Sequence, residues 1–489
     1  MRLSHPAHRV YPSLSEPAAR GFTEFLGGPV GRFAAVGRAR FFTPLRVLIA
    51  LALTFLSFGY LSKAACLGGI RQDDGSVSLN WAGSRQYTAA CYNDIVPLYS
   101  GRGLDQPGFV YAFSWTEGDL TRYMEYPVLA GLFQGIMGWW SRTTFPLIDA
   151  LGAPIPAASW YFTSTACVFA VLWVLTIGFV AELTGNRVWD TVLVAASPIV
   201  IVHAFSNWDI PSIFLAVLAM WLIARARPGW ALWAGVAIGL GTAFKLWPLY
   251  LLGAYLVLAV RARKLGAWVA MALTAAAAWL AVNIPIMLAY PEAWREFLRL
   301  NSERSWEWTT IWAVISRRTG WTGFDEAGEP TILNLVTFLL FAGACLGIAI
   351  YGWRVARTPR VAELVTLILA AFLLFNKVWS PQYSLWLVIP VVLALPRWRL
   401  LLTWMTTEMV LWPVLMWHLL GQDNKGAPDW LLDTIVITRD AFIVAICVLI
   451  IRQMARKVAD PVRAAHQGHD PLAGEFGVHK GRRQAKERI

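Results

Sequence analysis

The run LRVLIALALTFLSFGYLS at residues 45–62 decides the fold class, because it is apolar enough and long enough to cross the roughly 30 Å core of a bilayer as one helix. Similar apolar runs recur along the 489 residues. The whole chain is 57% apolar and only 15% charged, with a mean hydropathy of +0.51. A soluble protein carries roughly 25% charged residues. The composition therefore excludes a soluble enzyme, a disordered chain and a disulfide scaffold, and it predicts an all-α polytopic membrane protein.

Basic residues predict how the helices are oriented. Residues 1–43 hold six arginines and no apolar core, so this segment is expected in the cytoplasm and the loop at 63–126 outside. Later turns alternate between more and less basic ones, which fits a bundle of about 12 transmembrane helices with both termini cytoplasmic. The segment 127–140 is short for a full crossing and is interpreted as a juxtamembrane or re-entrant helix of the first external loop. The predicted organisation is a cytoplasmic segment at 1–43, a membrane domain at 44–455 with a second large external loop at 290–331, and a basic cytoplasmic tail at 456–489.

The net charge of +12 has a membrane explanation. The basic residues lie in the two tails and in short turns, where orientation and anionic lipid account for them, and the run at 480–486 is interpreted as a lipid contact of the tail rather than a nucleic-acid site. No Gly-rich phosphate loop, HExxH or CxxC motif occurs in the sequence, and only His203 and His418 lie in the membrane region. The sequence therefore shows no metal site and no required cofactor, and it leaves a need for a divalent cation open.

Two of the five cysteines flank the first polar loop. Cys66 and Cys91 stand at either side of it, whereas the other three cysteines lie in apolar runs and are interpreted as small core residues. If the loop is external, a disulfide between Cys66 and Cys91 is plausible, and the sequence leaves the bridged and unbridged states equally open.

The same loop gathers acidic and aromatic residues. Asp94 lies in the run 91–99, and Glu125 with Tyr126 follows at the end of the loop. A carboxylate at the membrane surface can act as general base toward a sugar hydroxyl. Taken alone, Asp94 is more simply a solvated loop acid.

Five short motifs in a fixed order change that interpretation. They are YNDIVPLY at 92–99, EYPVL at 125–129, SNWD at 206–209, FKLWP at 244–248 and NKVWSPQY at 376–383. In this order they resemble the GT-C glycosyltransferases, most closely glycosyltransferase family 87, which includes the actinobacterial polyprenyl-phosphomannose-dependent mannosyltransferases. The resemblance covers about residues 45–455. It implies a GT-C-like helical bundle, inverting transfer of a sugar from a polyprenyl phosphate, and Asp94 as the catalytic base.

The leaving phosphate of such a reaction needs charge stabilisation rather than a general acid. The cations expected near it are Lys377, Lys245 and Arg304, since both lysine and arginine bind phosphate. The alternative for each is a basic side chain that reaches the membrane interface and binds nothing.

Six further residues are predicted to bind substrate: Glu125, Tyr126, Asp209, His203, Gln382 and Tyr383. Asp209 either holds sugar hydroxyls beside Asp94 or caps the helix that follows it. Glu125 either binds the acceptor or fixes Tyr126 and the loop. His203 is more simply a buried neutral histidine than a phosphate ligand. Gln382 stands where relatives place a histidine, which shifts more of the phosphate binding onto Lys377.

The predicted function is a membrane glycosyltransferase in a bacterial plasma membrane, with mannose as the favoured sugar and a lipid-linked or cell-envelope glycan as acceptor at the external face. A polyprenyl-phosphoarabinose donor is the nearest variant. A secondary transporter or lipid flippase is the alternative from another class. It would need mid-membrane charges and repeat symmetry, whereas no repeat is visible and most acidic residues gather in the external loops. The high Ala, Arg and Trp content suggests a high-GC bacterium, and the resemblance implies an actinobacterial source.

Overall fold

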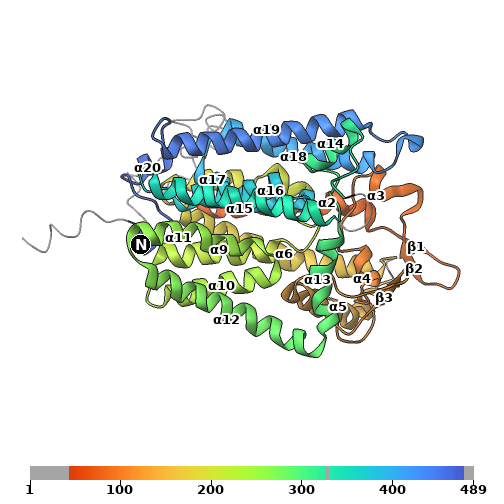
Figure 1. The fold of residues 1–489 in the computed structure, drawn as a ribbon. Helices are drawn as coiled ribbons and strands as arrows, with labels where there is room; N and C mark the ends of the chain where they lie inside the picture. Colours follow the sequence, from red (N-terminus) through yellow and green to blue (C-terminus); the bar gives the residue numbers. More distant parts are fainter. Residues whose placement is uncertain (1–42, 153, 326–329, 478–489) are drawn as a thin grey trace, which may run out of the picture.

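The computed structural model describes residues 43–152, 154–325 and 330–477. Within these ranges the chain is mostly helical, and the long helices run side by side (Figure 1). Six described segments are long and apolar enough to cross a membrane, by length and composition: Pro44–Cys66, Ala157–Leu183, Leu265–Ala289, Thr331–Arg354, Trp398–His418 and Asp429–Met454. They correspond to α2 (Pro44–Lys63) with the 3₁₀ turn η3 (Ala64–Cys66), and to α6, α12, α15, α18 and α19. The all-α membrane fold predicted from the sequence is confirmed at this level.

Shorter apolar helices lie among the long ones. They are α7 (Val192–Ala195), α8 (Pro198–His203), α9 (Ile210–Arg225), α10 (Trp230–Phe244), η6 (Trp247–Leu249) with α11 (Tyr250–Ala262), α16 (Val361–Phe375), and η7 (Pro381–Tyr383) with α17 (Ser384–Ala394). The other helical segments lie in loops and at the ends of the bundle: η4 (Ala82–Ser84), α3 (Arg85–Thr88), α4 (Pro97–Gly101), α5 (Val128–Asp149), η5 (Gly185–Thr191), α13 (Pro291–Glu303), α14 (Ile311–Thr319), η8 (Gln422–Asn424), α20 (Pro461–Ala465) and η9 (Gly474–Phe476).

One end of the bundle carries the long loop between α2 and α6. It contains two small antiparallel hairpins, β1 (Gly69–Arg71) with β2 (Val77–Leu79) and β3 (Trp115–Glu117) with β4 (Leu120–Arg122). These hairpins and α13 lie together at the right-hand end of the bundle in Figure 1. A disulfide joins Cys66 to Cys91, so the start of the loop is tied to the segment that carries Asp94.

α10 packs closely against α12. Gly235 and Gly239 face α12, and a Cβ at either position would lie within 2.3 Å of a backbone oxygen of that helix. Glycine therefore allows the two helices to approach each other closely. α10 ends at Phe244, and Lys245 follows in extended backbone at the same end of the bundle as the long loop.

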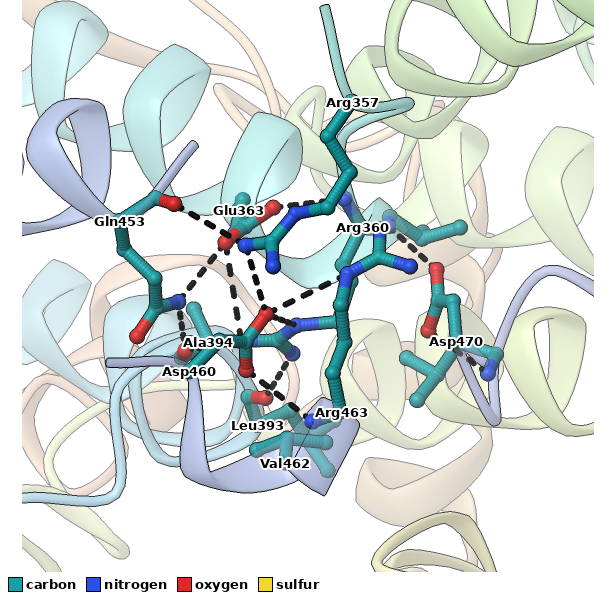
Figure 2. Close-up of polar contacts among 12 residues, drawn as sticks. Arg357, Arg360, Glu363, Leu393, Ala394, Gln453, Asp460, Val462, Arg463 and Asp470 are labelled. Carbon is teal, nitrogen blue, oxygen red and sulfur yellow. Dashed lines mark hydrogen bonds and ion pairs between the residues drawn. The ribbon is translucent and has the colours of Figure 1, made fainter. Parts of the chain in front are cut away.

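The opposite end is closed by the C-terminal segment at 456–477. Asp460 accepts hydrogen bonds from the guanidinium groups of Arg357 and Arg360 at 3.2 and 3.1 Å (Figure 2). Gln453 of α19 donates to Glu363 of α16 at 2.7 Å in the same cluster. These buried charges are paired and hydrogen-bonded, which is the condition for keeping them in a protein interior. The cluster holds the ends of α16, α17 and α19 together.

The helix after the first loop is longer than predicted. The sequence predicts a helix of about 14 residues at 127–140, whereas α5 has 22 residues and continues through Arg142 and Pro146. Arg142 donates to the carbonyl of Leu104, so its charge is satisfied within the fold. α5 is not among the six segments that qualify as long apolar spans. The interpretations placed on 1–42 and on the run at 480–486 lie outside the described residues.

Candidate active site

A polar cavity of about 660 Å³ lies at the end of the bundle that carries the long loop. Its walls come from segments far apart in the sequence: the long loop, the turns after α8, α10 and α16, the end of α13, and α15. Eight of the residues predicted for the site line it: Asp94, Glu125, Tyr126, Lys245, Arg304, Lys377, Gln382 and Tyr383. The fold thus brings together carboxylates and cations in a single cavity.

Asp94 is held by the backbone on both sides of it. Its N–H donates to the carbonyl of Ser206 at 2.8 Å, and its own carbonyl accepts from Leu98 at 3.2 Å. The ammonium of Lys63, which is fully buried at the end of α2, donates to the carbonyl of Tyr92 at 3.1 Å. The neighbouring Asp94 carboxylate, together with burial, raises the pKa of Tyr92, so this phenol keeps its proton. The carboxylate of Asp94 therefore faces the cavity from a fixed loop.

Lys245 points from the end of α10 toward the same loop. Its Nζ donates to Oδ1 of Asn207 at 3.2 Å and lies 3.8 Å from Oδ1 of Asp209. It also lies over the rings of Tyr126 and Tyr383, at 5.1 and 5.9 Å from their centroids. Aromatic faces attract cations at this range. Lys245 is thus a buried cation held at the cavity wall.

Asp209 lies behind Lys245 and does not line the cavity. It precedes α9, but its side chain does not cap that helix; its Oδ1 accepts from the indole of Trp386 at 2.9 Å instead. Burial raises the pKa of the Asp209 carboxyl, and the nearby lysine opposes this effect. Asp209 is thus a partner of Lys245 outside the cavity lining, and its predicted role in substrate binding stays a prediction.

A third group of charges surrounds the end of α13. Arg304 is 3.3 Å from Glu307, and Glu307 accepts from the hydroxyl of Ser380 at 2.8 Å. Lys377 donates to the carbonyls of Ser302 and Arg304 at the C-terminal end of α13. The last carbonyls of a helix have no hydrogen-bond partner within the helix, so they are free to accept from such a cation. Burial, followed by the charge of Arg304, lowers the pKa of Lys377 to about 8.

Glu125 is paired with a cation that sequence reasoning missed. Nε and Nη2 of Arg102 donate to both oxygens of Glu125, at 2.6 and 2.7 Å. The guanidinium also lies 3.9 Å above the ring of Trp115. A bidentate pair of this kind fixes both side chains. Glu125 therefore shapes the wall of the cavity, with its charge already balanced.

Aromatic rings form part of the cavity wall. Tyr383 stacks on Trp386 with ring centroids 4.1 Å apart, and Trp386 in turn stacks on Trp247 and Phe372. Gln382 lines the same wall and is largely buried. His203, in contrast, does not line the cavity: it is buried in α8 and meets the ring of Trp412 edge-on at 5.2 Å.

A second, apolar cavity lies next to the first. This groove of about 770 Å³ runs between α11, α15 and α16, and it is lined almost entirely by aliphatic and aromatic side chains. Leu249, Tyr250 and Phe341 line both cavities, so the groove lies directly beside the polar cavity. Several groove residues, among them Leu346 and Trp353, are more than half exposed and face the outside of the bundle.

Sequence reasoning missed three polar residues of this site: Arg102, Asn207 and Glu307. Asn207 lies inside a motif that carries the resemblance, but the motif alone does not indicate its role. Arg102 lies close to Glu125 only because the β3–β4 hairpin returns the chain. Glu307 lies outside all five motifs. Among the described residues no group of three or more His, Cys, Asp or Glu side chains is placed to hold a metal ion.

A helical membrane protein with carboxylates and cations around one cavity has the layout of a membrane-embedded enzyme. The sequence profile of glycosyltransferase family 87 matches residues 124–381, which is more than half of the chain. The chain therefore belongs to glycosyltransferase family 87, and it is a glycosyltransferase. The match contains Glu125, Asn207, Lys245 and Lys377, but Asp94 and Arg102 lie before it. No curated protein matches the chain.

Proposed function

We propose that this family 87 enzyme is an inverting glycosyltransferase that moves a sugar, with mannose as the first candidate, from a polyprenyl phosphate to a glycan acceptor. The acceptor is lipid-linked or part of the cell envelope. The observation that carries the proposal is a charged cavity that lies directly beside an apolar groove and shares three wall residues with it. A polyprenyl-phosphate sugar has the same two parts, a charged head and a long apolar chain.

The proposed chemistry uses the two kinds of charge in the cavity. Asp94 takes the proton of an acceptor hydroxyl, whose oxygen forms a bond to the anomeric carbon as the bond from that carbon to the phosphate oxygen breaks. The electron pair leaves with the polyprenyl phosphate, and Lys245, Arg304 and Lys377 stabilise its charge. Attack and departure on opposite faces of the sugar invert the anomeric centre.

The groove supplies the first test of the donor class. A Cβ at Gly253 of α11 would meet Ile368 only at an ordinary 3.8 Å, so a phenylalanine there can project into the groove without clashing with backbone. Gly253→Phe is expected to raise the KM for a long-chain polyprenyl-phosphomannose by about tenfold, equivalent to about 1.4 kcal/mol of binding. The KM for a short-chain, water-soluble analogue should change little, because that chain does not reach the groove. The measurement is sugar transfer by purified protein in detergent with each donor.

Gly343→Phe is the matched control for this variant. Gly343 lies in α15 and does not line the groove, and a Cβ added at this position would meet no atom within 4 Å. The variant therefore presents the same ring outside the groove. Equal effects of Gly253→Phe on long and short donors, or an equal effect of Gly343→Phe, would contradict the assignment of the groove to the prenyl chain.

The pH dependence supplies a second test, based on Lys377. Because the pKa of Lys377 lies near 8, its positive charge is lost as the pH rises through that value. We expect kcat/KM for the phosphate-linked donor to fall over the same range, since the charged form is the one that attracts phosphate. Lys377→Arg should move this decline to higher pH, because a guanidinium stays protonated. An alkaline limb that is the same in both proteins would show that Lys377 does not control donor binding.

We further propose a topology of about 12 spans with both termini cytoplasmic and the cavity on the external side of a bacterial plasma membrane. The six long helices together with α7–α8, α9, α10, α11, α16 and α17 supply this number of crossings if each short segment crosses. The turns at the end opposite the cavity carry Arg187, Arg227, Arg263, Arg357 and Arg397, which supports a cytoplasmic position for that end.

A further inference from the structure

We propose that Asn207 is a positioning residue that holds the Asp94 carboxylate and the Lys245 ammonium at a fixed separation across the cavity. The inference rests on the proposed role of Asp94 as base. Asn207 lies in the turn between α8 and α9, and only 4% of it is exposed. Its amide touches a carboxylate on one side and a cation on the other.

The hydrogen bonds of this amide fix which way it faces. Oδ1 accepts from the ammonium of Lys245 at 3.2 Å and from the backbone N–H of Trp208 at 2.6 Å. Both partners can only donate, so the oxygen must face them. Nδ2 therefore faces Asp94, where it donates to Oδ2 at 2.6 Å, and it also donates to the hydroxyl of Tyr126 at 3.0 Å. The two donors and the two acceptor positions of the amide are all used.

This arrangement determines what its neighbours can do. Oδ2 of Asp94 accepts a hydrogen bond from this amide, which fixes the direction of the carboxylate. Each carboxylate oxygen accepts more than one hydrogen bond, so an acceptor hydroxyl can still bind there. Because the Tyr126 hydroxyl accepts from Asn207, its own proton can point to a sugar in the cavity. Burial raises the pKa of Tyr126, which keeps that proton in place.

A fixed separation matters for an inverting transfer. The base must lie on one face of the anomeric carbon and the cations that stabilise the leaving phosphate on the other. Small errors in such placement cost large factors in rate. The planar amide of Asn207 lies between the Asp94 carboxylate and the Lys245 ammonium and contacts both. The hydrogen bond from the Asp94 N–H to the Ser206 carbonyl holds the same two segments together at the backbone. The simpler alternative is that Asn207 only closes a turn and stabilises the fold.

A pH profile separates these two roles, because a turn that merely folds does not set the ionisation of Asp94. The titratable groups around Asp94 are Lys63 from α2, Tyr92 and Tyr126 from the long loop, Asp209 and Lys245 from the turns after α8 and α10, and Arg304 and Glu307 from the end of α13. All of them remain in variants of Asn207. A shift in the acid limb of kcat/KM would therefore report the loss of the amide itself.

The experiment compares wild type, Asn207→Ala and Asn207→Asp in a sugar-transfer assay with polyprenyl-phosphomannose. Asn207→Ala should lower kcat by about 10- to 100-fold with a small change in KM, and move the acid limb up by about one pH unit. Asn207→Asp places a second carboxylate beside Asp94, and like charges raise the pKa of the base, so its acid limb should move up by about two pH units. Its activity should partly recover at high pH.

Gln453→Ala is the matched control. Gln453 is also a buried amide, and it donates to the Glu363 carboxylate at 2.7 Å (Figure 2). It lies near the C-terminal end of α19, at the end of the bundle opposite the cavity. It should reduce thermal stability without moving the pH profile. If Asn207 variants behave like Gln453→Ala while Asp94→Asn is inactive, the inference is overturned and the proposed base stands. If wild type itself transfers no sugar from this donor or a pentose donor, the proposed function fails and the inference falls with it.

Discussion

Asp94→Asn is expected to lower sugar transfer by about a thousandfold or more, because it removes the general base and leaves the rest of the cavity in place. An asparagine has nearly the same shape, and its oxygen can still accept the hydrogen bond that Asn207 gives to Oδ2 of Asp94. The backbone bond to Ser206 does not involve the side chain. The loss should therefore appear in kcat, with protein yield, thermal stability and donor affinity close to those of wild type.

Asp105→Asn provides the control in the same loop. Asp105 is exposed and does not line the cavity, so the same change of charge there should leave transfer unaltered. The other carboxylates near the cavity are already engaged: Arg102 holds Glu125, Ser380 and Arg304 hold Glu307, and Asp209 lies behind Lys245. If Asp94→Asn retained more than about a tenth of wild-type transfer, the assignment of the base to Asp94 would be wrong.

The membrane fold and the segments that form the site could be predicted from the sequence, since apolar runs and short motifs can be read directly along the chain. Composition and long apolar runs are enough to identify membrane helices. The motif order then identified segments that the fold gathers at one end, and Asp94, Tyr126 and Lys245 do line one cavity. Their roles in the reaction stay predictions.

Pairing between side chains could not be predicted in the same way. Whether Glu125 is unpaired or neutralised depends on the path of the β3–β4 hairpin, which brings Arg102 to it. The position of Asp209 behind Lys245, and not in the cavity, depends on the direction of one side chain at the start of α9. The sequence predicts too short a helix for α5 because the apolar run ends just before the charged Arg142. In the structure the carbonyl of Leu104 accepts a hydrogen bond from Arg142, and the helix continues past it.

Lys245→Met is expected to lower transfer by about 100- to 1,000-fold, since a cation placed where charge develops on the leaving phosphate stabilises the transition state. This single variant also affects folding. Asp209 is 1% exposed and lies 3.8 Å from the lysine, so removal of the lysine leaves a buried carboxylate without its cation. Breaking a buried pair in this way costs about 3 kcal/mol or more. A lower melting temperature is therefore expected together with the loss of activity.

A double variant separates the two effects of Lys245→Met. In Lys245→Met with Asp209→Asn the unpaired charge is gone, and the indole of Trp386 can still donate to the amide oxygen at position 209. Stability should return toward wild type, while transfer stays about 100-fold or more below it, because the cation facing the phosphate is still missing. Lys264→Met, at an exposed pair with Glu475 on the opposite end of the bundle, should change neither quantity, since exposed pairs contribute little. Recovery of transfer in the double variant would mean that Lys245 serves only to neutralise Asp209, and the phosphate site would then have to be built from Arg304 and Lys377 alone.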